Sequence, residues 1–426
     1  MSSIQLALVV LSLTAPAELS ATDWPQWRGP NRDGISKETG LLKTWPKDGP
    51  KLLWTFEDAG IGFSSFSVVG NALYTMGSQD EANGDKEFVL AVDTSSGKEL
   101  WRTPIGTFYK NGFGGGPRST PTVDGDKLYT LGAKGDLVCL NRADGAKVWA
   151  KNLGSDFGGG VPGWGYSESV LIDGDNLIVT PGGNKGSIIA LNKKTGETVW
   201  RCEDLKDNAG YSSVVVTEIG GVRQYIQQTM SSVAGVRASD GKLLWKRADI
   251  RYATAVVPTP IVYKDYVFVT SGYNAGCALI KLAQDGDGTK ANLVYTNKSI
   301  VNHHGGVIRV GEFIYGHSDN GGGWVCLDFL KSDKAEGPEP VSKFRFDKGS
   351  AVYADGALYC FGQSKGEVVK VIPSPDVWKE EGRFSLPKME AGRSKPGSVW
   401  SHPVIAGGKL YVRDQYYIFC YDVKAN

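Results

Sequence analysis

The hydrophobic and polar positions of this chain form a unit that recurs. In each copy a run of hydrophobic residues leads into a polar turn that contains glycine, and a short alternating strand then ends in tryptophan. Four copies are clear, and their tryptophans are Trp101, Trp149, Trp200 and Trp245. Glycine in the turn can adopt positive φ, which a tight reversal of the chain requires. Each copy therefore predicts a β-hairpin whose outgoing strand carries an aromatic anchor.

The unit repeats with a nearly constant period along most of the chain. When Trp54 is included, the tryptophans stand at positions 54, 101, 149, 200 and 245, so they are 45 to 51 residues apart. Less regular copies continue the series with Tyr295, Phe344 and Phe384. A period of about 40 to 50 residues made of short strands is typical of a β-propeller, whose blades are four-stranded sheets. We therefore predict an all-β fold, a β-propeller of four-stranded antiparallel blades.

The two ends of the repeat predict how the ring closes. Residues 51–56 form a single outer strand with a tryptophan but no hairpin before it, whereas residues 399–421 supply three strands and lack a fourth. If strand 51–56 completes the last blade, the ring has no free sheet edge. This arrangement gives eight blades in one propeller domain, residues 51–426. We expect residues 22–50 to be an extended lead-in that packs Trp24 and Trp27 on the outside or the bottom of the ring.

Composition and charge exclude some partners. The chain has 426 residues with 47 basic and 46 acidic side chains, a formal net charge of +1. No attraction to nucleic acid or to an anionic membrane is therefore expected. Residues 4–13 are apolar but too short to cross a bilayer, so we interpret residues 1–21 as a signal peptide. We predict a periplasmic or secreted monomer that does not span the membrane.

The six cysteines fit buried positions better than they fit chemistry. Most of them lie inside hydrophobic strands, where free cysteine behaves as a small hydrophobic residue. No Cys-x-x-Cys metal spacing and no haem-attachment motif occurs. A disulfide between blades stays open as an alternative. The cysteines are Cys139, Cys202, Cys277, Cys326, Cys360 and Cys420.

The repeat, a hydrophobic strand followed by Asx-x-x-[Thr/Ser/Asp]-Gly-x-x-x-Trp, resembles the pyrroloquinoline-quinone (PQQ) repeat. That repeat builds the eight-bladed propellers of the quinoprotein type, and Trp24–Pro30 resembles the start of exported bacterial PQQ-repeat proteins. The resemblance covers the chain from about residue 24 to its end. The superfamily includes PQQ-dependent alcohol dehydrogenases, the propeller lipoprotein of the outer-membrane barrel assembly machine and many binding proteins. The resemblance therefore implies the fold and leaves the function open.

The chain departs from both of the specific relatives. Quinoprotein alcohol dehydrogenases carry two adjacent cysteines over the quinone and hold Ca²⁺ with a Glu, an Asn and an Asp. This chain has no adjacent cysteine pair, and no such ligand set can be assigned. The assembly lipoprotein carries a lipidated cysteine, and the sequence before Cys139 offers no candidate for one.

Two function classes follow from these departures. We favour a non-catalytic exported scaffold that binds a protein, a glycan or a small molecule at one rim of the channel, with no metal and no assigned cofactor. The alternative is a quinoprotein oxidoreductase acting on an alcohol or a sugar, which would hold PQQ with Ca²⁺ in the channel.

The inner-strand alignment predicts where a site lies. In a propeller the innermost strand of each blade lines the central channel, and the residues where these strands begin form one rim. The alignment places one residue of each blade there: Ser64, Arg118, Ser167, Tyr211, Val257, His304, Lys348 and Trp400. Beside them stand Trp164, Tyr166, Glu168, Arg251, Tyr252, His303 and His402. We predict a ligand-binding rim, with a bland opposite mouth, formed by Arg118, Trp164, Tyr166, Glu168, Tyr211, His303, His304, Trp400 and His402.

These residue types have structural explanations as well as functional ones. His303 and His304 fit a metal ligand, a base, or hydrogen bonds between blades. Arg118, beside the glycines at 114–116, fits a clamp for a carboxylate or phosphate, or a salt bridge to Glu168. The aromatic side chains fit a stacking surface for a quinone or a sugar, or a plug that fills the channel.

Overall fold

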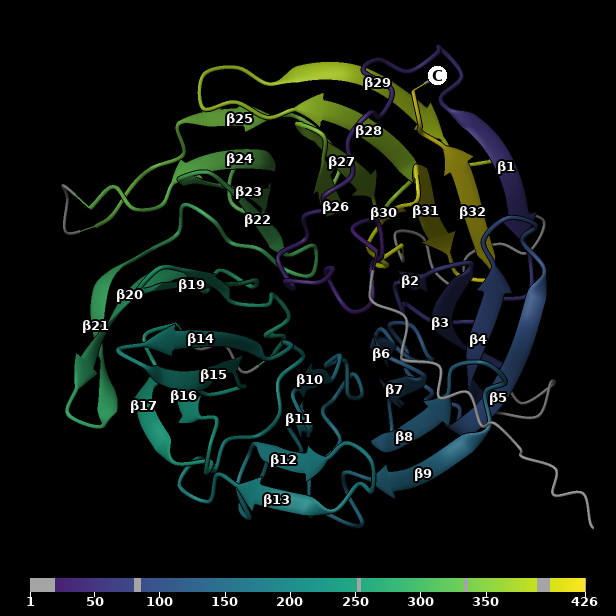
Figure 1. The fold of residues 1–426 in the computed structure, drawn as a ribbon. Helices are drawn as coiled ribbons and strands as arrows, with labels where there is room; N and C mark the ends of the chain where they lie inside the picture. The colour runs from purple at the N-terminus through teal and green to yellow at the C-terminus, as the bar shows by residue number, and fades with distance from the viewer. Residues whose placement is uncertain (1–19, 80–85, 251–253, 333–335, 389–398, 426) are drawn as a thin grey trace, which may run out of the picture.

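The computed structural model describes residues 20–79, 86–250, 254–332, 336–388 and 399–425. In these ranges every regular element is a β-strand, and the strands form eight four-stranded antiparallel sheets that surround a central channel as blades (Figure 1). The eight-bladed propeller predicted from the repeat is confirmed. None of the described residues forms a helix that could cross a membrane. The interpretation of residues 1–21 as a signal peptide falls almost entirely outside the described residues.

The strands of each blade follow the chain from the channel outward. Blade 1 contains β2 (Ser67–Val69), β3 (Ala72–Gln79), β4 (Lys86–Asp93) and β5 (Glu99–Thr107). Blade 2 contains β6 (Thr122–Asp124), β7 (Lys127–Leu131), β8 (Asp136–Asn141) and β9 (Lys147–Asn152). Blade 3 contains β10 (Leu171–Asp173), β11 (Asn176–Val179), β12 (Ile189–Asn192) and β13 (Thr198–Arg201). Blade 4 contains β14 (Val215–Ile219), β15 (Val222–Gln228), β16 (Val233–Arg237) and β17 (Leu243–Arg247).

The second half of the ring has the same order. Blade 5 contains β18 (Ile261–Tyr263), β19 (Tyr266–Ser271), β20 (Gly276–Asp285) and β21 (Gly288–Asn297). Blade 6 contains β22 (Val307–Val310), β23 (Phe313–Ser318), β24 (Gly323–Asp328) and β25 (Ser342–Phe344). Blade 7 contains β26 (Gly349–Ala354), β27 (Ala357–Gly362), β28 (Glu367–Ile372) and β29 (Lys379–Ser385). Blade 8 contains β30 (Val404–Ala406), β31 (Lys409–Asp414) and β32 (Tyr417–Asp422), with β1 (Lys51–Phe56) as its outer strand.

The ring closes as the two ends of the repeat predict. β1 pairs antiparallel with β32, from Lys51 opposite Asp422 to Phe56 opposite Ile418 (Figure 1). Arg413, which is 1% exposed on β31, adds a second link because its guanidinium donates to the backbone oxygens of Ala59 and Gly60 at 3.0 and 2.9 Å. Blade 8 is therefore joined to the chain that leads into blade 1 by a buried cation as well as by strand pairing.

The tryptophan of the repeat contacts the turn of the next blade. Trp149, on β9, donates from its indole nitrogen to the backbone oxygen of Lys193 at 3.0 Å. Gly196 of that turn has φ +73°, and a Cβ at this position would lie 3.0 Å from the Trp149 ring. The turn therefore needs glycine both for its backbone conformation and for the close approach of the indole. The same contacts, with indole hydrogen bonds of 3.1 Å, join three further pairs: Trp54 with Gly97, Trp101 with Gly145, and Trp200 with Gly241.

One interface departs from this rule. Trp245 donates to Oε1 of Gln224 at 2.8 Å, within its own blade. The next blade lacks the repeat's turn, because β20 and β21 extend for ten residues each and reverse at Asp285–Gly288. At the following interface Tyr295 takes the bridging role and donates to the backbone oxygen of Phe329 at 2.7 Å. The hairpin predicted for the fourth copy is confirmed, because Trp245 lies on β17 paired with β16, but its indole does not bridge to the next blade as the other four do.

All six cysteines are buried and none forms a disulfide. Their predicted role as small buried hydrophobic residues is confirmed, and the alternative of a disulfide between blades is not. The strand register explains two of them: Cys139 lies opposite Trp149, and Cys420 lies opposite Trp54. A small residue at this position leaves room for the indole to lean toward the next blade.

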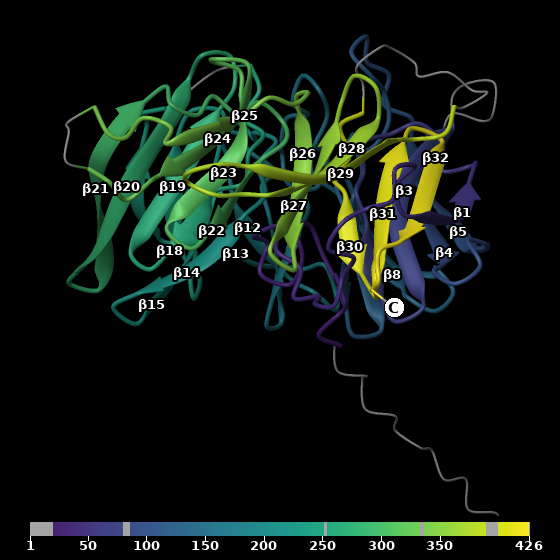
Figure 2. The same cartoon turned by 90° about the horizontal axis from the view of Figure 1, so that it is seen from above.

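The lead-in crosses the channel toward the lower face in Figure 2, so its predicted place on the outside of the ring is wrong (Figures 1 and 2). The alternative of the bottom agrees, except that Trp27 also enters the channel. Arg28 donates to the backbone oxygen of Val307, and Arg32 to that of Val170. Both guanidinium groups are buried, and they satisfy carbonyl oxygens on inner strands that have no neighbouring strand on the channel side. Further hydrogen bonds reach the inner strands of other blades through Trp24 with Val68, Pro25 with Val123, Trp27 with Thr259, and Ser36 with Tyr353 and Ile405. The lead-in therefore contacts seven of the eight inner strands or the residues next to them.

Replacing Trp149 with alanine should lower the free energy of unfolding by about 3 kcal/mol, as for other large-to-small changes at packed aromatic residues. The loss combines the indole hydrogen bond and its packing on the turn of blade 3. Val148 on the same strand is 41% exposed, and Val148→Ala should change the free energy of unfolding by no more than about 0.5 kcal/mol. Urea unfolding of both variants measures the difference. A loss below about 1 kcal/mol for Trp149→Ala would mean that the indole does not join the blades.

Deleting residues 51–56 should lower the melting temperature of the whole propeller, because blade 8 would lose its outer strand and β32 would become an exposed edge. The deletion also removes Trp54 from the turn at Gly97. Differential scanning calorimetry provides the measurement. A truncated protein that melts at the parent temperature would contradict closure by β1.

Candidate functional site

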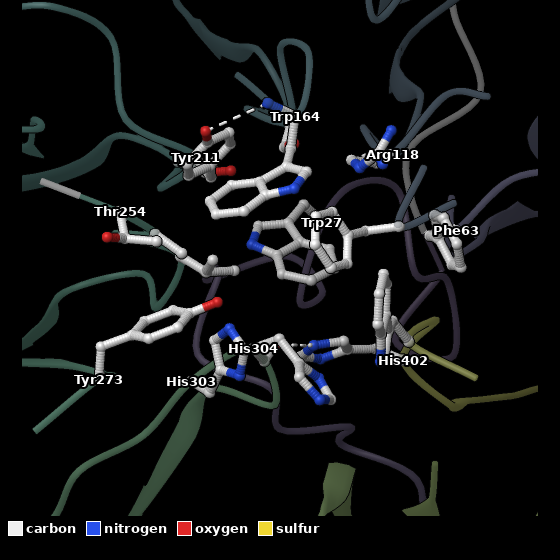
Figure 3. A pocket seen from close by; sticks show the side chains of 16 residues that line it. Trp27, Phe63, Arg118, Trp164, Tyr211, Thr254, Tyr273, His303, His304 and His402 are labelled. Atoms are coloured by element: carbon white, nitrogen blue, oxygen red, sulfur yellow. Dashed lines mark hydrogen bonds between the residues drawn. The ribbon is translucent and has the colours of Figure 1, made fainter. Parts of the chain in front are cut away.

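One mouth of the channel is a pocket of about 500 Å³ (Figure 3). We call it the central pocket. Its walls come from the segments that lead into the inner strands, and Trp27 reaches it from the lead-in. The hydrogen bonds between the lead-in and the inner strands lie deeper in the channel than the lining residues do. Trp27 therefore forms the inner end of the pocket. The lining residues are Trp27, Phe63, Phe113, Arg118, Trp164, Ser167, Tyr211, Ser213, Thr254, Ala255, Val257, Tyr273, His303, His304, Trp400 and His402.

The inner-strand alignment brings most of its rim residues into this pocket. Six of the eight aligned positions line it: Arg118, Ser167, Tyr211, Val257, His304 and Trp400. Ser64 is instead fully buried, and its hydroxyl donates to the backbone oxygen of Ser65 at 3.1 Å. Lys348 stands behind His303, where its ammonium pairs with Asp319 at 2.8 Å.

Seven of the nine candidate site residues line the pocket, and Tyr166 and Glu168 do not. Neighbouring side chains on an extended segment point to opposite faces, so Ser167 faces the pocket while Tyr166 and Glu168 enter the blade interfaces. Tyr166 donates to the backbone oxygen of Pro181 at 2.9 Å. Glu168 accepts from the backbone of Thr180 at 2.8 Å, and burial raises its pKa to about 7. Of their neighbours at the rim, Arg251 and Tyr252 lie outside the described residues.

Aromatic rings form two sides of the pocket (Figure 3). On one side the ring of Trp164 lies 5.7 Å from that of Tyr211 and 6.3 Å from that of Phe113, centroid to centroid. On the other side Phe63 lies 4.7 Å from Trp400. These edge and tilted contacts leave ring faces for a bound group to stack on.

The hydrogen-bond partners of the three histidines determine their tautomers. Gln363 Oε1 accepts from the Trp400 indole at 3.1 Å and lies 2.8 Å from His304 Nε2, so His304 carries its proton on Nε2. His402 Nε2 lies 3.2 Å from the backbone oxygen of His304 and is likewise the donor. The Lys348 ammonium donates to His303 Nδ1 at 2.9 Å, which leaves the His303 proton on Nε2. The Nδ1 atom of His304 is buried and has no partner.

The three imidazoles are neutral at physiological pH. Burial, reinforced by the nearby Lys348, lowers the pKa of His303 to about 4. Burial, with Arg28 nearby, lowers the pKa of His402 to about 3, and burial holds the pKa of His304 well below its ordinary value. Imidazoles of such low pKa are weak proton acceptors. The cluster therefore offers hydrogen bonds to a ligand rather than acid–base chemistry.

Arg118 is the cation of the pocket. Its guanidinium donates to the backbone oxygens of Gly116 and Gly114 at 2.7 and 2.5 Å and lies 5.2 Å from the centroid of the Phe63 ring. None of the ion pairs in the described part of the chain includes Arg118, and Glu168 accepts from Thr180 instead, so the considered bridge to Glu168 does not form. Burial lowers the pKa of Arg118 to about 10, and the group stays charged at pH 7. The carboxylate that acts on the pKa of Arg118 is Glu87.

The pocket does not fit the calcium and quinone site that the resemblance implies. Ca²⁺ takes six to eight oxygen ligands, chiefly from carboxylates and amides. Of the lining residues within the described ranges, none is Asp, Glu, Asn or Gln. Among the described residues there is also no group of three or more His, Cys, Asp or Glu that could hold a metal ion. The lining residues that remain supply stacking surfaces and hydrogen bonds.

Seven lining residues escaped the predicted rim: the aromatic residues Trp27, Phe63, Phe113 and Tyr273, and the small residues Ser213, Thr254 and Ala255. Phe63 directly precedes the aligned rim position Ser64, so an alignment that allowed a shift of one residue would have included it. Phe113 is an aromatic residue within a glycine run, which is a usable signal for an exposed loop. Trp27 comes from a segment without repeat character, and no sequence pattern predicts that this segment enters the channel.

Comparison with known proteins gives the family. The model of the family described as outer membrane protein assembly factor BamB matches residues 85–337, more than half of the chain. The chain belongs to this family of PQQ-repeat propellers. The BamB protein of Yersinia pestis is 20% identical over 294 residues, covering 58% of this chain and 70% of that protein. A tetrathionate hydrolase of Acidithiobacillus ferrooxidans is 25% identical over 248 residues, covering 52% of this chain and 44% of that enzyme.

Solved structures show the same fold at low sequence identity. The quinohemoprotein alcohol dehydrogenase of Comamonas testosteroni superposes with a TM-score of 0.64 at 12% identity and covers 95% of this chain and 81% of that one. BamB of Moraxella catarrhalis superposes with a TM-score of 0.51 at 13% identity and covers 82% of this chain and 97% of that one. An enzyme and an assembly factor thus share the architecture, and neither likeness assigns a function to the BamB-family chain described here.

The pocket histidines should stay neutral throughout the mildly acidic range. Because burial holds the pKa values of His303 and His402 at about 4 and 3, neither ring should titrate above pH 5. Nitrogen-detected NMR of the imidazoles should show the Nε2–H tautomer for both at pH 7, with His303→Gln and His402→Gln used for assignment. The same chain in urea should titrate near 6.5 and serves as the reference. A midpoint above about 6 in the folded protein would contradict the burial of the cluster.

Proposed function

We propose that this protein is an exported, non-catalytic binding scaffold that holds its partner at the central pocket. The observation that carries the proposal is the convergence of residues from seven blades and the lead-in on one concave, largely aromatic cavity. Aromatic residues and arginine are the types that dominate binding energy at recognition sites. The opposite mouth is closed by the lead-in, so the pocket is the side of the channel that a partner can enter.

The protonation states support binding over catalysis. A general base must lie within hydrogen-bond reach of the substrate and have a pKa near the working pH. The pocket histidines have pKa values far below 7, and no lining residue is a carboxylate. Glu87 and Glu168 have pKa values raised to about 7 by burial, but both are enclosed within the blades and neither lines the pocket.

The family supports a protein partner and an extracytoplasmic location. Relatives carry the description outer membrane protein assembly factor, and the Yersinia pestis protein is matched over 70% of its length. A protein of that description works on other proteins outside the cytoplasm, which agrees with the apolar segment at residues 4–13. We therefore place this protein in the periplasm or at the cell surface, with a protein segment as its partner.

A photo-crosslinker at the pocket mouth should capture that partner. Phe113 is 63% exposed at the pocket, and Val377, between β28 and β29, is 70% exposed outside it. Benzoylphenylalanine at position 113 should give a discrete adduct in the producing cells, and the same group at position 377 should not. Adding Arg118→Ala and Trp400→Ala should reduce the adduct by at least about fivefold, since both residues line the pocket. An undiminished adduct in a correctly folded double variant would mean that the pocket is not the working surface.

The dehydrogenase alternative has its own decisive test. Purified protein mixed with PQQ and Ca²⁺ and then desalted should retain no Ca²⁺ and should oxidise neither alcohols nor sugars, because none of the described lining residues offers a carboxylate or carboxamide ligand for the cation. A stoichiometric absorbance that survives desalting, together with oxidation of an alcohol or a sugar, would replace the scaffold proposal with the enzyme.

A further inference from the structure

The polar atoms of the central pocket are mainly hydrogen-bond donors. The Nε2–H of His303 is free once Lys348 occupies Nδ1. The indole nitrogen of Trp164 lies on the side of its ring nearer Arg118 (Figure 3), and its contact with Tyr211 uses only the backbone N–H. A guanidinium has five N–H donors, and Arg118 spends two of them on Gly114 and Gly116. Three side chains from three blades, His303, Trp164 and Arg118, therefore keep N–H groups for a ligand.

The charge of the pocket has one sign. Arg118 is a cation at neutral pH, the histidines are neutral, and none of the lining residues that the structure describes is acidic. Lys348 behind His303 is neutralised by Asp319. Arg118 forms no ion pair with the described carboxylates, although the buried Glu87, outside the pocket, acts on its pKa. A cation at the wall of an apolar cavity attracts an anion, because the low local dielectric strengthens the interaction. The same charge disfavours a cationic ligand, although aromatic cages otherwise bind cations.

The apolar surface sets the shape of the ligand. Seven aromatic residues line the cavity, and its volume of about 500 Å³ is in the range of small-molecule sites. Trp27 closes the inner end and lies 4.5 Å from the His402 ring, centroid to centroid. A flat ring with one anionic group uses all of these features.

We infer that the central pocket binds a planar aromatic carboxylate without a divalent cation, with the carboxylate toward Arg118 and Trp164 and the ring between the aromatic walls. The inference deepens the proposed function and rests on it, since it names the chemical group recognised at the same pocket. That group is either a free aromatic acid or an aromatic residue at the carboxyl end of a protein chain. It also distinguishes this pocket from a calcium and quinone site, whose carboxylate and carboxamide ligands do not occur among the described lining residues.

Three matched probes test the charge. Isothermal titration calorimetry in EDTA compares 2-naphthoate with the neutral 2-naphthalenemethanol and the cationic 2-naphthylmethyl-trimethylammonium. The carboxylate should bind at least about tenfold more tightly than the alcohol, because hydrogen bonds to a charged group are the stronger kind. The cation should bind most weakly. Equal affinity for the three probes, or binding of naphthoate only when Ca²⁺ is added, would overturn the inference.

Two variants locate the anionic group. Arg118→Gln should abolish the preference for naphthoate over the alcohol, and Trp164→Phe, which keeps a ring but removes the indole N–H, should reduce it about threefold. Affinity for the neutral alcohol should change less than about twofold in both. Arg102→Gln is the matched control, because Arg102 lies on β5 outside the pocket and pairs with Glu99. A full preference in Arg118→Gln would overturn the assignment.

The two sources of the carboxylate are distinguished by N-acetyltryptophan and its amide. Binding of N-acetyltryptophan but not of the amide supports recognition of the end of a protein chain, and binding of naphthoate alone supports a free aromatic acid. If neither carboxylate binds while the crosslink at position 113 is still lost in the Arg118→Ala and Trp400→Ala variant, the inference fails and the scaffold proposal stands. If both the probes and the crosslink fail, the proposed function fails with it.

Discussion

The fold depends on one contact, the indole of one blade lying on the glycine turn of the next. A single hairpin or blade buries too little apolar surface to be stable alone, so each blade needs its neighbour. The contact at Trp149 and Gly196 combines a hydrogen bond of 3.0 Å with ring packing that only glycine permits. Because such contacts hold successive blades at a constant angle, the inner strands begin at the same level. Residues distant in sequence consequently meet at one mouth.

The lead-in connects the stability of the ring to the chemistry of the pocket. Arg28 and Arg32 donate to backbone oxygens of the inner strands. The inner strands have no neighbouring strand on the channel side, so their backbone groups there require other hydrogen-bond partners. These hydrogen bonds hold the segment across the channel and place Trp27 at the inner end of the pocket. The same stretch of chain thus completes the backbone hydrogen bonding and supplies part of the binding surface.

The ring was predictable because its signals are local and repeated. The hairpin pattern, the tryptophan period and the unmatched strand at 51–56 are each read from short segments, and they gave the eight blades and their closure. The rim was predictable to within one residue for seven of the eight blades, since Ser167 faces the pocket while Tyr166 and Glu168 alternate away from it, and Phe63 takes the place of Ser64. In blade 7 the aligned Lys348 lies behind His303 instead. The path of the lead-in and the departure at Trp245 depend on long-range packing and on the altered turn of blade 5, which no local pattern encodes.

The pairing of β1 with β32 also has a kinetic consequence. Residues 51–56 find their partner only at residues 418–422, almost at the end of the chain. Contacts of such long sequence separation slow folding, because the loop-closure entropy is lost before any contact compensates it. Until β32 is available, β1 has no pairing strand, and its backbone N–H and C=O groups remain exposed to other chains. The chain is therefore most exposed to aggregation just before folding is complete. A chaperone would protect it best by covering β1 until β32 has formed.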